Sequence, residues 1–122
     1  MGIESYRQLA VWAKAMDVAR SIYALCDLMP KREEYRLTAQ LIRAAISIPA
    51  NIAEGRARGT RKEYAHFISI ARGSTAELET LLLLAESASL LAPDAVRPAL
   101  ASVEEVGRML NGLHAKLKQP TT

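Results

Sequence analysis

The sequence predicts an all-α protein, an antiparallel up-down four-helix bundle, and three observations support this prediction. Apolar residues recur every three or four positions in four segments, which is the spacing of one helix face. Of the 122 residues, 50% are hydrophobic but only 5% are aromatic, so mainly aliphatic side chains and Met must fill the core. The connections between the segments are short, which favours antiparallel neighbours within one domain spanning residues 1–122.

The first predicted helix covers about residues 5–28 and carries two apolar stripes. One stripe begins at Leu9 and Trp12, and the other begins at Val11 and Ala15. At about 100° per residue, the two stripes together cover an arc of roughly 200°, which is wider than one bundle core can bury. We therefore expect a second packing partner, either a groove between helices or another subunit; the alternative is that small apolar residues simply lie at the surface. The residues assigned to an oligomer interface are Val11, Val18 and Ile22.

The second predicted helix covers residues 33–55 and contains a proline. Pro49 has no N–H to donate to Ala45, and its ring crowds that carbonyl, so we expect a kink. The helix should continue beyond the kink and stop near Gly55.

The third and fourth predicted helices have clearer starts. The third covers residues 60–91 and opens with Thr60 and Glu63 at the spacing of a capping box. The fourth covers residues 94–118 and has Pro98 in or next to its first turn, where proline is tolerated.

The sequence offers few groups for catalysis, because it has two His, one Cys and no glycine-rich phosphate loop. The sharpest metal candidate is Glu63-x-x-His66, since di-iron bundles use such a pair from each of two helices. Here the motif occurs once, and His114 is preceded at the same spacing by Asn111. Cys26 lies on an apolar stripe without a cationic neighbour, so we expect an inert core thiol. We predict a protein that is not an enzyme and has no catalytic residue, cofactor or metal.

The sequence also predicts where in the cell the protein is found. The first residues lack the basic and apolar regions of a secretory signal, and the strongest apolar run, residues 81–85, is far shorter than a membrane span. The single Cys cannot form an internal disulfide, which fits a reducing compartment. We therefore expect a soluble, cytoplasmic protein with no membrane partner.

Polar residues recur every three or four positions within the otherwise apolar second helix, so they share one face. On the third helix, a Gly73-Ser74 step precedes Glu77 and lets another backbone approach. This face forms either a pocket for a ligand or a hydrogen-bonded network with an ion pair between Arg43 and Glu77; the network is the favoured interpretation. Its assigned members are Gln40, Arg43, Asn51, Glu54, Ser74 and Glu77.

Basic residues cluster at the turn between the second and third helices. The guanidinium group of arginine can donate two parallel hydrogen bonds to a phosphate group. The net charge of +3 permits an acidic partner without requiring one. The alternative is a charged turn that is only solvated, although repetition around a symmetric assembly would strengthen its potential. The residues assigned to nucleic-acid contacts are Arg56, Arg58, Arg61 and Lys62.

Four motifs carry a resemblance to a known family. They are Leu9-x-Val11-Trp12, Tyr35-x-Leu37-x-x-Gln40, Ser47-Ile48-Pro49-x-Asn51-Ile52-Ala53-Glu54-Gly55 and Ile70-Ala71-x-Gly73-Ser74-x-x-Glu77. Over almost its whole length, the chain resembles the four-helix bundle proteins encoded in intervening sequences of 23S ribosomal RNA genes. The resemblance implies an antiparallel bundle that assembles as a homopentameric ring. A related branch, the accessory variability determinant of diversity-generating retroelements, implies a basic surface for nucleic acid and a reverse transcriptase.

Together, these observations predict a non-enzymatic, oligomeric helical bundle that binds nucleic acid, in the first place RNA, through its basic surface. The alternative is a protein-interaction scaffold or accessory subunit that serves a polymerase-type protein without contacting nucleic acid. The resemblance supplies no activity, because the family name records where a gene was found.

Overall fold

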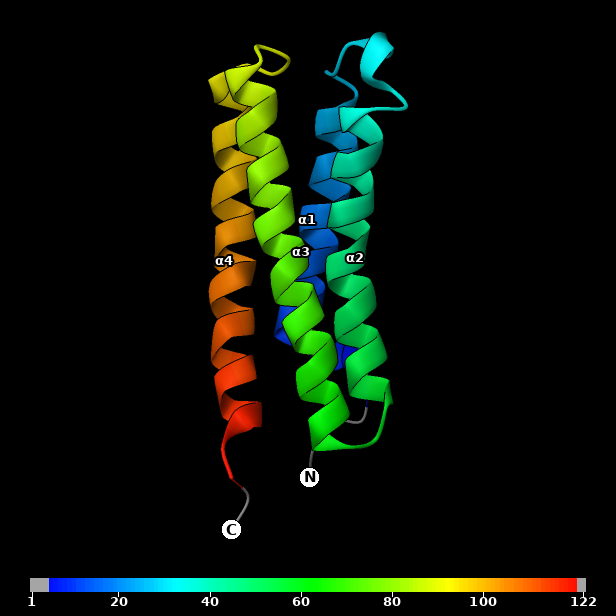
Figure 1. Ribbon diagram of the computed structural model, residues 1–122, viewed down its shortest axis with the longest axis vertical. Helices are drawn as coiled ribbons and strands as arrows, with labels where there is room; N and C mark the ends of the chain where they lie inside the picture. Colours follow the sequence, from blue (N-terminus) through cyan, green and yellow to red (C-terminus); the bar gives the residue numbers. More distant parts are fainter. Residues whose placement is uncertain (1–4, 121–122) are drawn as a thin grey trace.

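Four antiparallel helices follow one another up and down the bundle in the computed structural model, which describes residues 5–120 (Figure 1). The predicted all-α up-down bundle is therefore confirmed. The four helices are α1 (Ala10–Cys26), α2 (Leu37–Ala57), α3 (Arg61–Ser87) and α4 (Pro93–Lys118). Two short 3-10 helices, η1 (Tyr6–Gln8) and η2 (Lys31–Glu33), precede α1 and α2.

The first helix begins later than the predicted range 5–28. The Ser5 hydroxyl accepts a hydrogen bond from the Arg7 amide at 3.2 Å, which caps η1 as a separate turn. Leu9 is then extended, with φ −77° and ψ 126°, so a new helix has to start after it. The chain therefore uses residues 5–9 to turn into the bundle rather than to lengthen α1.

The second helix also begins later than the predicted range 33–55. Arg36 has φ −117° and ψ −113°, outside the helical region, and the regular helix starts at Leu37. The helix is continuous through Pro49 and ends at Ala57, so the proline does not terminate it.

The third helix starts as predicted and ends before the end of the predicted range 60–91. The Thr60 hydroxyl accepts a hydrogen bond from the Glu63 amide at 3.1 Å, which caps the helix start. Ser89 has φ 60°, a left-handed conformation that ends the helix. The fourth helix begins one residue before the predicted range 94–118 and ends with it.

The residues assigned to an oligomer interface lie inside the protomer, so that assignment was wrong. Val11, Val18 and Ile22 are 7%, 3% and 0% exposed and belong to the core. The physical reason is that α1 packs against both α2 and α4, so most of the apolar arc of α1 is buried within one protomer. The other stripe is less buried: Trp12 is half-buried, packs against the core and meets the Tyr6 ring edge-on, with ring centroids 5.4 Å apart.

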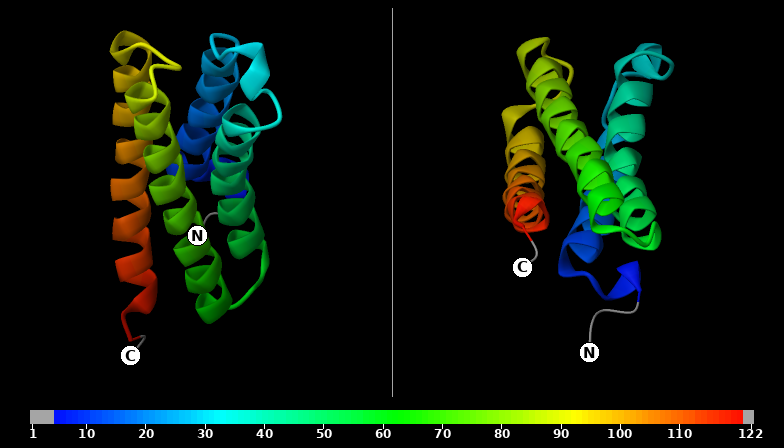
Figure 2. Two further views of the ribbon diagram at one scale, coloured as in Figure 1. Left: turned by 45° about the horizontal axis from the view of Figure 1, so that its top comes forward. Right: turned by 60° about the horizontal axis from the view of Figure 1, so that its bottom comes forward.

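The bundle is not equally tight along its length. Figure 2 shows that α3 crosses the bundle obliquely, so that α3 and α4 lie close together near the turn that joins them. They diverge towards the other end, where α3 begins and α4 ends (Figures 1 and 2). The hollows described below lie along this pair of helices.

Candidate functional site

The predicted polar face of α2 contacts α3 through two sets of hydrogen bonds. The Arg43 guanidinium donates to Glu77 Oε2 at 2.8 Å and to Gln40 Oε1 at 2.5 Å. One turn further along, the hydroxyls of Ser47 and Ser74 are 2.7 Å apart. These contacts satisfy polar groups between the helices and fix their register, as expected of a packing network.

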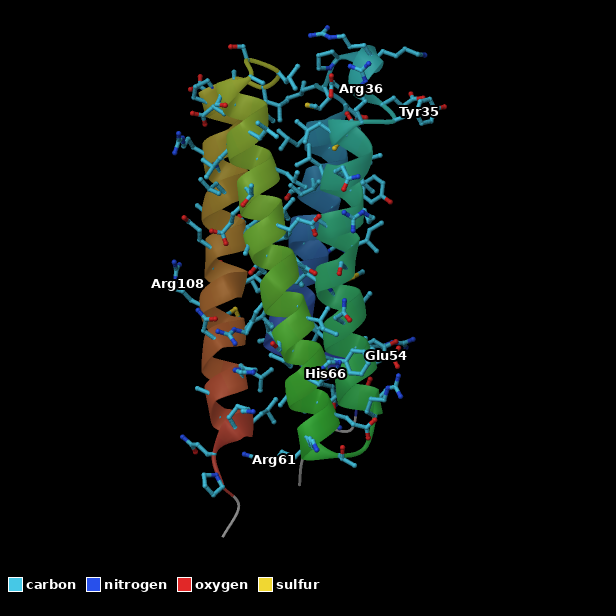
Figure 3. The ribbon with its side chains drawn as sticks, in the orientation of Figure 1. Tyr35, Arg36, Glu54, Arg61, His66 and Arg108 are labelled. Atoms are coloured by element: carbon cyan, nitrogen blue, oxygen red, sulfur yellow. The ribbon has the colours of Figure 1, made fainter. Side chains whose placement is uncertain are left out.

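Asn51 extends the second set, because its side-chain amide donates to the Ser47 carbonyl at 2.8 Å and to the Ser47 hydroxyl at 3.0 Å. Glu54, the remaining assigned member, lies apart from these contacts. It pairs with Arg58 across one helical turn, with 2.9 Å between Oε2 and Nε (Figure 3). The structure therefore brings five of the six assigned residues into the two sets and places Glu54 with the basic turn.

The basic cluster at the turn is divided by its neighbours. Arg58 is paired with Glu54, lies 3.8 Å from Glu63, and has its guanidinium 4.9 Å from the centre of the Phe67 ring. Its charge is largely neutralised by these two carboxylates. Arg58 is thus committed to the turn itself.

Arg61 makes its contacts with α4 instead. Its Nε donates to the Leu117 carbonyl at 3.2 Å and its Nη2 to the Lys116 carbonyl at 2.6 Å, so it caps the C-terminal end of α4 (Figure 3). Two cations flank it: Lys62 is exposed, and Arg56 is half-buried close to Tyr64. Burial raises the pKa of the Tyr64 phenol, and the charge of Arg56 opposes that rise.

Three hollows of about 660, 550 and 410 Å³ run along α3 and α4. The first and second are both lined by Ser69, and the second and third are both lined by Arg61 and Leu117, so the three hollows adjoin one another along α3 and α4. Together we call them the α3–α4 groove. Its cationic and imidazole side chains are Arg56, Arg61, Lys62, His66, Arg72, Arg108, His114, Lys116 and Lys118. Two carboxylates, Glu79 and Glu104, line only the end farthest from the start of α3.

Arg72 crosses the groove from α3 to α4. Its Nε donates to Asn111 Oδ1 at 2.9 Å, and its Nη1 lies 3.0 Å from His114 Nδ1. Because a guanidinium can only donate, His114 must accept at Nδ1 and carry its proton on Nε2. Burial, then the charges of Arg72 and Lys118, lower the pKa of His114 below its usual 6.5, so this ring is neutral at pH 7.

At the far end of the groove, burial raises the pKa of Glu79, and the nearby carboxylate of Glu104 adds to the rise. Because Arg72 and Arg108 line the same hollow as these two carboxylates, the groove changes from strongly basic near the start of α3 to balanced in charge at this end.

Sequence reasoning missed the contribution of α4 to this surface. Asn111, His114 and Lys118 recur at three- and four-residue spacing and so share one face of α4, with Arg108 just before them. That spacing was the available signal. Only the fold shows that this face lies opposite His66 and Arg72 of α3. Lys62, Arg108 and Lys118 make no ion pair within residues 5–120, and Figure 3 shows Arg108 pointing outward from α4.

The residues weighed for other chemistry have structural surroundings. Glu63 accepts a hydrogen bond from the Thr60 hydroxyl at 3.0 Å, and the His66 ring meets Phe67 edge-on. In the described part of the chain, no three His, Cys, Asp or Glu side chains are grouped as metal ligands. Burial, with the charge of Asp27, raises the pKa of the half-buried Cys26 to about 11. Among the helices of residues 5–120, none is both long and apolar enough to cross a membrane.

Comparison with known proteins finds a family model and similar solved structures. A family model described as 23S rRNA-intervening sequence protein matches residues 7–112. The crystal structure of a protein of unknown function, from the S23 ribosomal protein family of Bacteroides thetaiotaomicron, is similar with a TM-score of 0.81 and 22% identity. That alignment covers 90% of this chain and 100% of the other, and at this identity it shows a shared fold alone. No functionally curated protein matches the chain.

Proposed function

Since the chain belongs to the 23S rRNA-intervening sequence protein family, we propose that it is a non-enzymatic bundle that binds nucleic acid through the α3–α4 groove. The observation that carries the proposal is the charge of this surface. Seven of the 16 Lys and Arg residues and both His line the groove, against two carboxylates of residues 5–120. RNA is the form that the proposal takes first, with DNA as the alternative.

The groove supports phosphate contacts better than the turn does. Lys62, Arg108 and Lys118 are exposed and have no ion-pair partner within residues 5–120, so their charges are available to an anion. Arg72 is held in place by Asn111 and His114, which presents a preoriented guanidinium. Arg58 is left out of the proposed contacts because Glu54 and Glu63 already neutralise it.

A double substitution tests this proposal. Lys62→Ser with Lys118→Ser removes two groove charges, and Lys31→Ser with Arg32→Ser removes two exposed charges on η2, at the opposite end of the bundle. Binding of a fluorescein-labelled RNA of mixed sequence is measured by anisotropy between about 50 and 200 mM salt. If both groove residues contact single-stranded phosphates, the slope of log affinity against log salt should fall by about 1.4 in the groove variant. No binding by the unmodified protein, or equal losses in both variants, would contradict the proposal.

We also propose that copies of the chain assemble as the homopentameric ring that the family resemblance implies. Support comes from the outer face of the bundle, because Ile46 on α2 and Ile70 and Leu84 on α3 are large apolar residues with 43%, 39% and 50% exposure. Ile70→Lys with Leu84→Lys should give a folded monomer by light scattering and circular dichroism. A wild-type protein that is monomeric at micromolar concentration would contradict this assembly.

A second candidate function is a scaffold or accessory subunit for a polymerase-type protein. The observation that favours it is the aromatic surface near the ends of α1, where Trp12 is half-exposed and Tyr23 is 52% exposed. Tyr23→Ser would then weaken binding of the partner, whereas the groove variant above would leave it unchanged. The reverse pattern would favour the nucleic-acid proposal.

A further inference from the structure

The third hollow of the α3–α4 groove lies at the end of the bundle where α3 begins, and we call it the end pocket. This end pocket has a volume of about 410 Å³, within the range of sites that bind small molecules. Leu9, Leu113 and Leu117 supply apolar surface, and the Tyr64 ring lines it from α3. All four side chains are only half-buried, so apolar and aromatic surface remains open to a ligand.

Three cations line the pocket beside this apolar surface, and among residues 5–120 no carboxylate lines it. Arg56 comes from α2, Arg61 from the start of α3 and Lys116 from the end of α4. Arg61 uses two of its five N–H groups to cap α4, which fixes the guanidinium and leaves three donors for a ligand. The Thr60 hydroxyl is already engaged with Glu63 and is not counted as a ligand contact.

We propose that the end pocket binds the terminal nucleotide of a single-stranded nucleic acid and its terminal phosphate. This inference rests on the proposed function, since the rest of the strand would lie in the α3–α4 groove. An unpaired terminal base can turn towards the Tyr64 ring and the leucines, whereas a paired one is held in the duplex by its partner base.

The charge of the pocket distinguishes a chain end from an internal nucleotide. An internal phosphate carries a single negative charge, but a terminal phosphate monoester carries about −1.5 to −2 at pH 7. A pocket lined by cations from three helices matches the second group better than the first. The position also fits, because the pocket is the last of the three adjoining hollows.

The test uses one short RNA sequence with a 5′-phosphate, with a 3′-phosphate, or with hydroxyls at both ends. Binding is measured with the full chain and with two matched variants, Lys116→Ser in the end pocket and Lys118→Ser in the groove. One of the two phosphorylated RNAs should bind about tenfold more tightly than the hydroxyl form. Lys116→Ser should reduce this preference at least threefold, whereas Lys118→Ser should weaken all three RNAs alike and leave the preference intact.

Two further RNAs test the contact with the base. Removing the terminal base to leave an abasic residue should weaken binding at least fivefold, and a blunt duplex should gain nothing from its terminal phosphate. If RNA binds but end phosphorylation has no effect, or Lys118→Ser abolishes the preference as fully as Lys116→Ser, the end-pocket proposal is overturned while the proposed function stands. If no RNA binds at all, both proposals fail.

Discussion

Gly55 lies at a close approach of α2 and α3, and its replacement by alanine gives a quantitative test of the fold. A Cβ at this position would lie 2.7 Å from Phe67 Cβ and 3.2 Å from Tyr64 Cδ1. Phe67 Cβ is attached directly to the backbone of α3 and cannot rotate away, so the two helices would have to separate. Forcing an extra methyl into a packed core costs about 1–3 kcal/mol, and the better helix propensity of alanine offsets about 0.5–1 kcal/mol. Since the contact is shorter than real Cβ contacts, we expect a net loss of about 2 kcal/mol in the free energy of unfolding.

The assay is urea unfolding followed by far-ultraviolet circular dichroism, at one fixed protein concentration. Gly112→Ala is the matched control, because Gly112 is an exposed position within α4 and an added Cβ there meets nothing within 4 Å. It should raise the free energy of unfolding by about 0.5–1 kcal/mol through helix propensity alone. If Gly55→Ala proves as stable as the unmodified protein, the close approach of α2 and α3 described above is incorrect.

Three further predictions follow from burial and charge. Val18→Asp should unfold the protomer, because it places an unpaired carboxylate at a position only 3% exposed. If circular dichroism and light scattering instead find a soluble, folded monomer, the assignment of Val18 to an oligomer interface would be restored. Cys26 should react with iodoacetamide at half its maximal rate near pH 11 rather than pH 9, with the urea-unfolded chain as control; rapid reaction of folded protein at pH 7 would contradict this. Burial and the charges of Arg72 and Lys118 lower the pKa of His114, so its contribution to stability should be present above pH 6.5 and be lost as the pH falls through its folded pKa. NMR titration of this ring should find a pKa below 6.5, and bound RNA should raise that pKa.

The fold could be predicted from the sequence because the four apolar periodicities and the capping box act locally. The error over α1 has a geometric cause. A helical projection shows the width of an apolar arc, but it does not show how many neighbours will cover it. Val11 and Ile22 are buried because α1 packs against both α2 and α4, and this arrangement becomes visible only when the whole bundle is assembled.

The candidate site was predictable only where its residues are neighbours along the chain. Arg61 and Lys62 were identified because they lie in one basic turn, but Arg58 was assigned to the same surface although Glu54 neutralises it. The α4 side of the groove was missed because His114 lies more than fifty residues from Arg61 in sequence, and only the antiparallel pairing of α3 with α4 brings them to one hollow.

The two carboxylates at one end of the groove have a consequence for the length of any polyanion that lies in it. From Arg61 to Glu79 the α3 helix rises by roughly 27 Å, at about 1.5 Å for each residue. Near that distance, Glu79 and Glu104 offset the charges of Arg72 and Arg108, so a strand anchored at the basic end has a fixed length over which the surface attracts it. In a nuclease protection experiment, such an arrangement would show up as a short footprint of constant size, whatever the total length of the RNA.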